Sequence, residues 1–322
     1  MRTRLVSAWM FAAGVFLHTG CARPLSHGLT DRFLVHRDAS HAARRRTAPT
    51  PSLEESIGKI RKLMAEARPE PKAAPLQTLE AHEPVLSEAL AAFSTSPTAE
   101  NAIAVGSAYH RYTLLDQAYA YYARALRLDP KSPGAYEGLA RVWRDWRLPQ
   151  LGLGDAVRAT YYAPTSATAR NTLGTILQAL GHRKQARDAF AAALARDANA
   201  AYALNNLCYL SFLDGDAPRA IAECRQAIGL DPTLAAAHNN LGLTYAALGR
   251  TELASAEFAR AGGTAVAAYN LGIVYLARRQ YAEAANQFER VPAGDPAVTG
   301  AVERAHEARR LAKTILDTGD KP

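Results

Sequence analysis

The feature that most constrains the fold of this chain is that its sequence repeats itself. The stretch NNLCYLSFLDGD at residues 205–216 returns 34 residues later as NNLGLTYAALGR at residues 239–250, in the same register. Self-comparison extends this period from about residue 99 onward. Alanine is abundant, which favours helices, and no alternating runs of Val, Ile and Thr indicate strands. The sequence therefore predicts an all-α chain built from repeated helical units.

Each copy carries small residues at its positions 8, 20 and 27, large residues at 7, 11 and 24, and often proline at 32. Small residues let two helix axes approach, large residues fill the space between them, and proline ends the second helix. One helix pair cannot bury its own apolar face, so the pairs are expected to stack. Gly152 and Ala156 predict a weakened second helix in the second copy, and the fifth copy is four residues short at AGGTAV. The six copies begin at Ala99, Pro133, Ala167, Ala201, Ala235 and Ala265.

This pattern resembles the tetratricopeptide repeat (TPR) over residues 99–298, with several matching positions in every copy. The resemblance implies an α-solenoid of helix-turn-helix units wound into a right-handed superhelix with a concave inner surface. Residues 299–319 resemble the C-terminal capping helix of TPR arrays. Residues 83–98 are expected to form an N-terminal capping helix, or else the second helix of a degenerate further repeat.

The first residues have the layout of a bacterial export signal. A basic start precedes an apolar run of 13 residues at 5–17, which is short for a transmembrane helix, and HTGCA follows. This ending resembles a lipoprotein signal with Cys21 as the lipid-bearing residue, although His18 departs from the usual pattern. The alternatives are cleavage before Arg23, which gives a soluble exported protein, and a chance apolar stretch. We therefore expect a signal peptide at 1–21 and a lipid-anchored protein on the periplasmic side of a bacterial membrane, the outer membrane being favoured.

Residues 22–82 are expected to form a flexible tether. Residues 1–75 hold 13 Lys/Arg and 6 Asp/Glu, so 7 of the net charge of +8 lies there. A nucleic-acid surface needs that charge on the folded body, so we expect no nucleic-acid partner. The arginines of HAARRRTAPTPS at 41–52 either contact anionic lipid headgroups or are solvated, and composition favours solvation.

Within the tether, SLEESIGKIRKLMAEAR at residues 52–68 predicts an amphipathic helix isolated between proline-rich stretches. Ser52 and Glu55 form a capping box at its start. The helix docks either on the folded body, on a partner or on a membrane, and the sequence leaves these alternatives open. Its apolar stripe consists of Leu53, Ile57, Ile60, Leu63 and Met64.

TPR proteins that bind peptides do so with positions 2, 5, 6, 9, 12 and 13 of the first helix of each repeat, and the resemblance implies the same use here. The expected peptide-binding residues are Arg141 and Arg144 in the second repeat, Asn171 and Gln178 in the third, Tyr202, Asn205, Asn206, Tyr209 and Phe212 in the fourth, Asn239, Asn240 and Leu243 in the fifth, and Tyr269, Asn270 and Ile273 in the sixth.

Asparagine recurs at position 6 of three repeats, as Asn206, Asn240 and Asn270. An asparagine amide both donates and accepts hydrogen bonds, so it can pair with the main chain of any extended peptide. The alternative is that these side chains hydrogen-bond neighbouring repeats. The sequence favours the two interpretations about equally.

The expected groove changes from charged and polar in the second and third repeats to apolar and aromatic in the fourth to sixth. Tyr202, Tyr209 and Phe212 lie outside the usual core positions, so they are expected to be exposed aromatics of a binding surface. The alternative is that the segment 52–68 or a neighbouring repeat covers them. Basic residues occur at the groove positions of one repeat only, as Arg141 and Arg144, so a carboxylate clamp is not expected.

The sequence contains no phosphate-binding glycine loop, no HExxH, no GxSxG and no paired-cysteine motif. We therefore expect no enzymatic activity, no cofactor and no metal. The expected function is an envelope-located scaffold that binds segments of partner proteins, similar in architecture to the TPR lipoproteins of pilus assembly. The alternatives are a docking subunit for a cell-wall or glycan-processing enzyme, a carbohydrate-binding protein and an intracellular TPR regulator.

Cys208 and Cys224 stand at positions 8 and 24 of the fourth repeat, where its sisters mostly carry a small residue and an aromatic one. The two positions face each other across the helix pair, and an exported protein meets an oxidising compartment. These observations predict a Cys208–Cys224 disulfide. The alternative is a pair of buried thiols.

Overall fold

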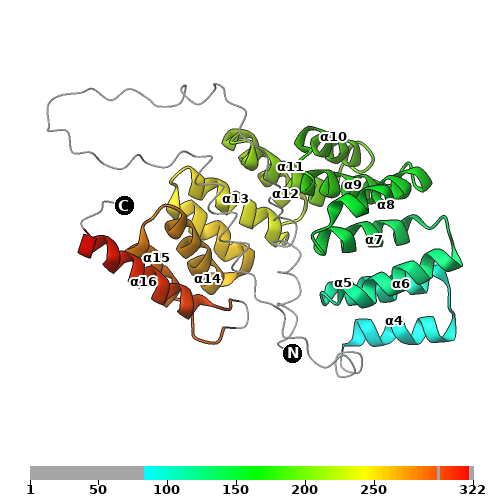
Figure 1. The fold of residues 1–322 in the computed structure, drawn as a ribbon. Coiled ribbons are helices and arrows are strands. Elements are labelled where there is room, and N and C mark those ends of the chain that lie inside the picture. The colour runs from blue at the N-terminus through cyan, green and yellow to red at the C-terminus, as the bar shows by residue number, and fades with distance from the viewer. Residues whose placement is uncertain (1–82, 296–297, 319–322) are drawn as a thin grey trace.

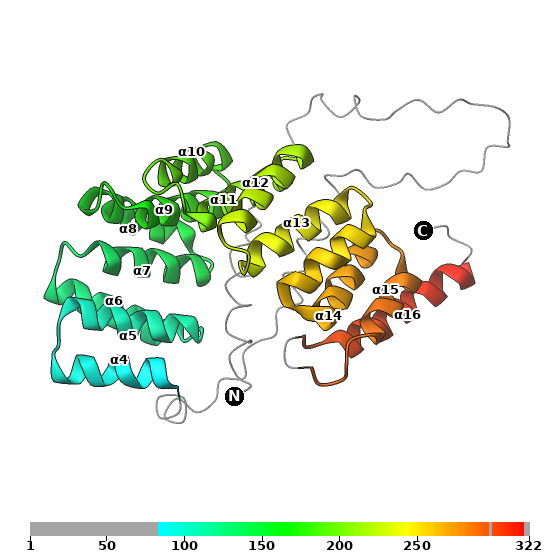
Figure 2. The same cartoon turned by 180° about the vertical axis from the view of Figure 1, so that it is seen from behind.

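A computed structural model describes residues 83–295 and 298–318 of the chain. The described part is helical throughout and forms a curved stack (Figure 1), which Figure 2 shows from behind. Its helices are α4 (Pro84–Thr95), α5 (Ala99–Arg111), α6 (Leu115–Leu128), α7 (Pro133–Asp145), α8 (Pro149–Tyr162), α9 (Ala167–Ala179), α10 (Arg183–Leu194), α11 (Ala201–Leu213), α12 (Ala217–Leu230), α13 (Ala235–Ala247), α14 (Thr251–Ala277), α15 (Tyr281–Glu289) and α16 (Ala301–Thr318).

Consecutive helices pack as antiparallel pairs, beginning with α5 on α6 and ending with the second half of α14 on α15. The first helices of adjacent pairs also contact one another. Such contacts join α5 to α7, α7 to α9, and α11 to α13. Between residues 99 and 295, no two adjacent second helices are in comparable contact. A curved stack brings helices closest together on its inner side. The first helices therefore line the inner side of the curve, and the structure is an all-helical α-solenoid of stacked helix pairs.

Glycine at position 8 allows the two helices of a repeat to meet. A Cβ atom on Gly174 would lie 2.5 Å from the ring of Phe190, and one on Gly242 would lie 2.6 Å from the ring of Phe258. Position 8 thus lies directly beneath the aromatic ring at position 24 of the same repeat. The rings of Phe190 and Phe258 are completely buried there.

The second repeat corrects one expectation, because α8 is an unbroken helix of 14 residues. Gly152 lies so close to α7 that a Cβ atom would be 2.9 Å from the main-chain oxygen of Ala140. Ala156 is fully buried. Both small residues therefore serve close helix contact, and the helix is held by packing and not by its intrinsic propensity.

The short fifth repeat has no separate loop after its second helix. One continuous element, α14, contains both that helix and the first helix of the sixth repeat, and it is interrupted only at Gly262 and Gly263. Gly263 has φ of 87° and ψ of 179°, a conformation essentially restricted to glycine. The missing residues are therefore absorbed by a sharp glycine bend.

Two further helices cover the ends of the stack. Leu86 and Phe93 of α4 are buried against the first repeat, and Ala301, Ala305 and Ala308 of α16 are buried against the sixth. Among the described residues, no helix has the length and apolar character required to cross a membrane. The predicted signal, the tether, the helix at 52–68 and Cys21 all lie outside the described residues.

Candidate functional site: the inner face of the first helices

The inner face is defined here as positions 2, 5, 6, 9, 12 and 13 of the first helices α5, α7, α9, α11, α13 and the second half of α14. All peptide-binding residues expected from the sequence fall on these helices. The structure brings many of them together by contacts between neighbouring repeats. It divides them into a row of paired amides, a charged end and an apolar end.

The asparagines pair with one another from one repeat to the next. The Asn206 amide nitrogen donates to the Asn171 side-chain oxygen at 2.8 Å. Asn240 donates to Asn205 at 2.9 Å, and Asn270 donates to Asn239 at 3.0 Å. In every pair, position 6 donates to position 5 of the preceding repeat. Of the two interpretations left open by the sequence, the structure shows the contact between repeats.

At the charged end, Asp145 of α7 joins two repeats. His110 of α5 lies 2.9 Å from its carboxylate, and Arg144 contacts it at the same distance. Arg144 also donates to the Thr175 hydroxyl at 3.3 Å, so this expected peptide-binding residue is tied into the stack. Burial by itself would raise the pKa of Asp145, but the Arg144 charge and the hydrogen bonds from His110 and Arg144 prevail and lower it well below the ordinary range.

Gln178 of α9 is the exception to this internal pairing. It stands at position 12, is only 9% exposed, and neither its amide oxygen nor its amide nitrogen has a hydrogen-bond partner within the described structure. The Nε atom of Arg141, at position 9 of the preceding repeat, is likewise buried without a partner. Burial raises the pKa of the nearby Glu137 carboxyl, although the Arg141 charge opposes this shift. Three buried polar atoms of Gln178 and Arg141 therefore have hydrogen-bonding capacity that the described residues do not use.

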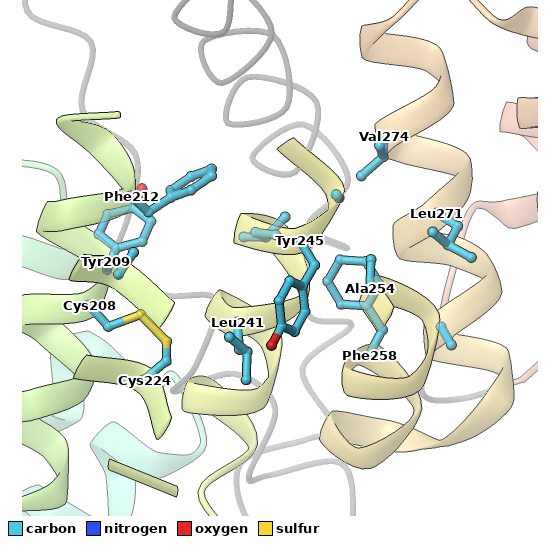
Figure 3. Close-up of a cluster of buried hydrophobic side chains, with 14 of the residues drawn as sticks. Cys208, Tyr209, Phe212, Cys224, Leu241, Tyr245, Ala254, Phe258, Leu271 and Val274 are labelled. Carbon is cyan, nitrogen blue, oxygen red and sulfur yellow. A yellow bond between two sulfur atoms is a disulfide. The ribbon is translucent and has the colours of Figure 1, made fainter. Parts of the chain in front are cut away.

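At the apolar end the first helices are buried on all sides. Every residue from Ala203 to Phe212 in α11, and from Ala237 to Ala246 in α13, is buried. Tyr209 and Phe212, which lie together on α11 in Figure 3 with ring centroids 6.1 Å apart, are 3% and 2% exposed.

The expectation that Tyr209 and Phe212 are exposed aromatics is therefore wrong for this structure. Both rings belong to a buried cluster that also includes Leu243 and Ala246 of α13, so the neighbouring repeat contributes to their burial. Tyr202 is only partly buried, and burial with the nearby negative charges of Asp197 and Glu137 raises its pKa.

Two expected peptide-binding residues are covered by the last helix. Tyr269 and Ile273 share a buried cluster with Ala301, Ala305 and Ala308 of α16. The Tyr269 hydroxyl accepts a hydrogen bond from Arg304 of α16 at 3.0 Å. Burial raises the pKa of Tyr269, and the Arg304 charge opposes the shift. The inner face of the sixth repeat is thus occupied at these positions by the chain's own terminal helix.

Directly behind the inner face, a disulfide links α11 to α12. The Cys208 and Cys224 sulfur atoms are 1.97 Å apart, and their Cα atoms are 5.2 Å apart (Figure 3). The bond takes the place that a glycine beneath an aromatic ring has in the sister repeats. It lies in the same buried cluster as Tyr209 and Phe212.

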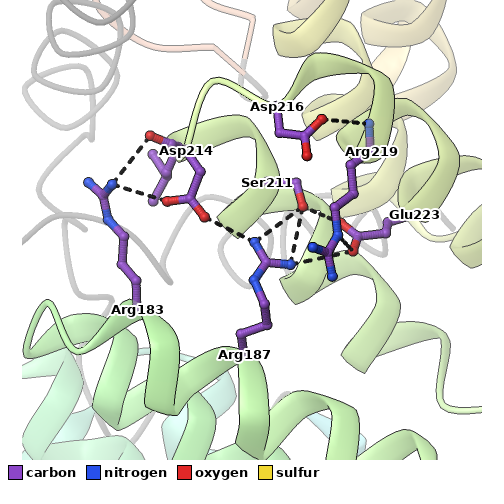
Figure 4. A network of polar contacts seen from close by, with 8 residues as sticks. Arg183, Arg187, Ser211, Asp214, Asp216, Arg219 and Glu223 are labelled. Carbon is purple, nitrogen blue, oxygen red and sulfur yellow. Dashed lines mark hydrogen bonds and ion pairs between the residues drawn. The ribbon is translucent and has the colours of Figure 1, made fainter. Parts of the chain in front are cut away.

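A polar network, not anticipated from the sequence, joins the third repeat to the fourth (Figure 4). Arg187 of α10 donates to the Ser211 hydroxyl at 3.3 Å and lies 3.0 Å from Asp214. Ser211 in turn donates to the buried Glu223 carboxylate at 2.5 Å. The signal in the sequence was Ser211 at position 11, where the fifth and sixth repeats carry tyrosine. The network lies at the junction between the charged and apolar ends of the inner face.

Within residues 83–295 and 298–318, no group of His, Cys, Asp and Glu side chains is arranged to hold a metal ion. Within the described part of the inner face, the unpaired groups are the Gln178 amide and the Nε atom of the Arg141 guanidinium. These groups suit recognition of another chain.

Comparisons with known proteins agree with this geometry. Tetratricopeptide repeat families match residues 171–235 and 235–261. No curated protein sequence matches the chain. Among solved structures, a chain of the Cut9-Hcn1 hetero-tetramer of the APC/C is 19% identical, with a TM-score of 0.59 over 80% of this chain and 56% of that one. This chain thus spans little more than half of that protein's length.

A tetratricopeptide repeat protein from Parabacteroides merdae is 16% identical, with a TM-score of 0.54 over 80% of this chain and 99% of that one. PilF of Pseudomonas aeruginosa is 16% identical over 70% of this chain and 98% of its own, with a TM-score of 0.49. At these identities the first two likenesses concern the fold alone. Tetratricopeptide repeats are protein-interaction scaffolds and are typically not enzymes. The chain is accordingly an α-solenoid whose residues 171–261 match tetratricopeptide repeat families.

Proposed function

We propose that this chain is a scaffold of the bacterial envelope that binds a segment of a partner protein on its inner face, without enzymatic activity. The apparent export signal and Cys21 support an exported, lipid-anchored protein. An anchored TPR array suits the assembly of a multi-protein envelope structure such as a pilus or a secretion system. This last step rests on architecture, so the partner must be found by experiment.

The single observation that carries the proposal is Gln178. A buried amide without hydrogen bonds destabilises a protein by about 1–3 kcal/mol, so an amide left unpaired in this way calls for an explanation. The carbonyl and NH₂ of Gln178 match the N–H and C=O of a peptide main chain. The Nε atom of Arg141 adds a donor on the preceding repeat. The polar end of the inner face is therefore suited to a main chain running across the first helices.

A carbohydrate ligand is less well supported. Sugar-binding sites use exposed aromatic faces, whereas Tyr209 and Phe212 are buried. The asparagine pairs also satisfy one another between repeats and are not aimed at a ligand.

Replacing Gln178 by leucine tests the proposal. Gln178→Leu keeps a side chain of similar size and removes the unpaired amide, so we expect the free energy of unfolding to rise by about 1–3 kcal/mol. Recovery of the partner in cross-linked pull-downs from membrane extracts should fall. Gln150→Leu on α8, an exposed glutamine, is the matched control and should change neither measurement.

Two results contradict the proposal. Gln178→Leu that lowers stability shows that the amide has a structural role. If the Gln178→Leu variant recovers every cross-linked protein as well as wild type does, Gln178 is not part of the binding site. Location is tested separately by fractionation, where Cys21→Ser should release the chain from the membrane fraction.

A further inference from the structure

The apolar end of the inner face is buried beyond what its neighbouring helices explain. The helices packed against α11 are α10, α12 and α13, and those packed against α13 are α11, α12 and α14. All of them lie beside or behind the first helices. The side chains on the inner face are nevertheless almost inaccessible to solvent in the single chain. The exposed fractions are 3% for Tyr209, 2% for Phe212 and 6% for Leu243.

A helix that is apolar on all sides is expected to have neighbours on all sides. Helix α9 is buried less completely, because its inner-face residues Thr175 and Gln178 are buried whereas Asn171 is only partly buried. Apolar cover is therefore needed over α11, α13 and the second half of α14, where Leu276 is 9% exposed. We call these inner-face residues, Tyr209, Phe212, Leu243, Ala246 and Leu276, the apolar floor.

We propose that residues 52–68 of the same chain form the amphipathic helix that lies on the apolar floor. Between residues 22 and 82 this segment has the longest stripe of large apolar residues at helical spacing. Its side chains Ile57, Ile60 and Met64 are of the kind that fill gaps between aromatic and leucine side chains. A peptide helix seated in an apolar groove by residues spaced 3 and 4 apart is a recurring mode of recognition.

The length of the intervening chain permits this placement. Residues 69–82 are 14 residues, which reach up to roughly 45 Å when extended. Four interhelical steps separate α4 from α11 along the first helices, or about 40 Å at 8–10 Å each. The segment therefore reaches the floor from the start of α4 without strain. The polar end, with Gln178 and Arg141, lies outside the apolar floor.

Hydroxyl-radical footprinting of a chain of residues 22–322, which leaves out the predicted signal and Cys21, tests this placement. We compare wild type with Ile57→Gln/Ile60→Gln, which removes the apolar stripe and keeps good helix formers. The control is Lys59→Gln/Glu66→Gln, which changes the opposite helical face and leaves the net charge unchanged. Oxidation of Tyr209 and Phe212 is expected to rise at least threefold in the stripe variant and to stay at the wild-type rate in the control.

A reciprocal measurement identifies the occupant. Met64 should be protected in wild type and oxidise several-fold faster in Phe212→Gln/Leu243→Gln. Equal rates of Tyr209 oxidation in all three chains overturn the proposal. Rapid oxidation of Met64 in solution, with protection only when anionic vesicles are added, overturns it as well. Protection that disappears on dilution also overturns it, because the cover is then a second copy. The test needs no partner, so its outcome is independent of the proposed function.

Discussion

At the scale of single residues, the inner face is held by side chains that satisfy one another. Asn205 and Asn240 are both buried, and their hydrogen bond satisfies a donor and an acceptor that water cannot reach. The same arrangement recurs with Asn171 and Asn239, so the row of amides fixes the register of neighbouring first helices. These asparagines are thus part of the stack's internal framework.

Removing one member of a pair should leave the other unsatisfied. We expect Asn240→Ala to lower the free energy of unfolding by about 1–3 kcal/mol in urea titrations, because the Asn205 oxygen loses its donor. Asn205→Ala combined with Asn240→Ala should cost clearly less than the sum of the two single changes, since neither buried partner then remains. Strict additivity would show that the amides do not interact.

Asp145 makes stability depend on pH. Its pKa is lowered in the folded chain, so its ionised form stabilises the fold above the ordinary aspartate pKa of about 4. That contribution is lost as the pH falls below this value toward the lower pKa of the folded state. The difference in unfolding free energy between wild type and Asp145→Asn should therefore shrink between pH 5 and pH 3. A difference independent of pH in this window would contradict the assignment.

At the scale of helix pairs, the fourth repeat replaces a glycine and an aromatic ring by a disulfide. We expect Cys208→Ser or Cys224→Ser to cost about 3 kcal/mol, the usual contribution of a bond that closes a loop of this length. Cys208→Gly/Cys224→Phe restores the pattern of the sister repeats, in which Phe258 lies over Gly242. This double variant should recover most of the stability and lose all sensitivity to reductant.

Thiol counting is the direct check on the pairing. Unfolded wild type without reductant should show neither Cys208 nor Cys224 reactive. Two reactive thiols would show that Cys208 and Cys224 are buried free cysteines and not a disulfide.

The bend in α14 offers a second comparison between elements. A Cβ atom on Gly263 would meet nothing within 4 Å, so Gly263→Ala tests the backbone conformation alone. Because φ is positive there, we expect a loss of about 1–3 kcal/mol in unfolding free energy. Gly229→Ala on α12 is equally free of contacts and has ordinary helical geometry, so it should be neutral or stabilising by up to about 1 kcal/mol. Equal effects of the two changes would exclude strain at the bend.

The helix pairs were predictable from the sequence because small and large residues at fixed positions describe contacts within one repeat. Gly174 beneath Phe190 is such a contact, and it recurs with the period. The bend at Gly263 and the hydrogen bonds between Asn240 and Asn205 were not predictable in the same way. They depend on how one repeat sits on the next, and several arrangements of the same residues satisfy the pattern.

At the scale of the whole molecule, the inner face has two regions with different chemistry. The charged end contains Asp145, Arg144 and Gln178, and the apolar end contains Tyr209 and Phe212. The polar network of Arg187 joins the repeats at their junction. The sequence predicted this change of character along the array, but it gave the burial of the apolar end only as the alternative to an exposed surface.

The disulfide also determines how far the molecule can stretch. If the chain is held at one end by a membrane and pulled at the other, the helix pairs of a stacked array can open one after another. The bond between Cys208 and Cys224 would keep the residues between them from extending. This segment spans a separation of 16 residues, or about 50 Å of contour length. Single-molecule pulling should therefore give a chain longer by about this amount after reduction, and a chain of unchanged length in Cys208→Gly/Cys224→Phe. Such a bond would limit the extension of the array at its middle while leaving both ends compliant.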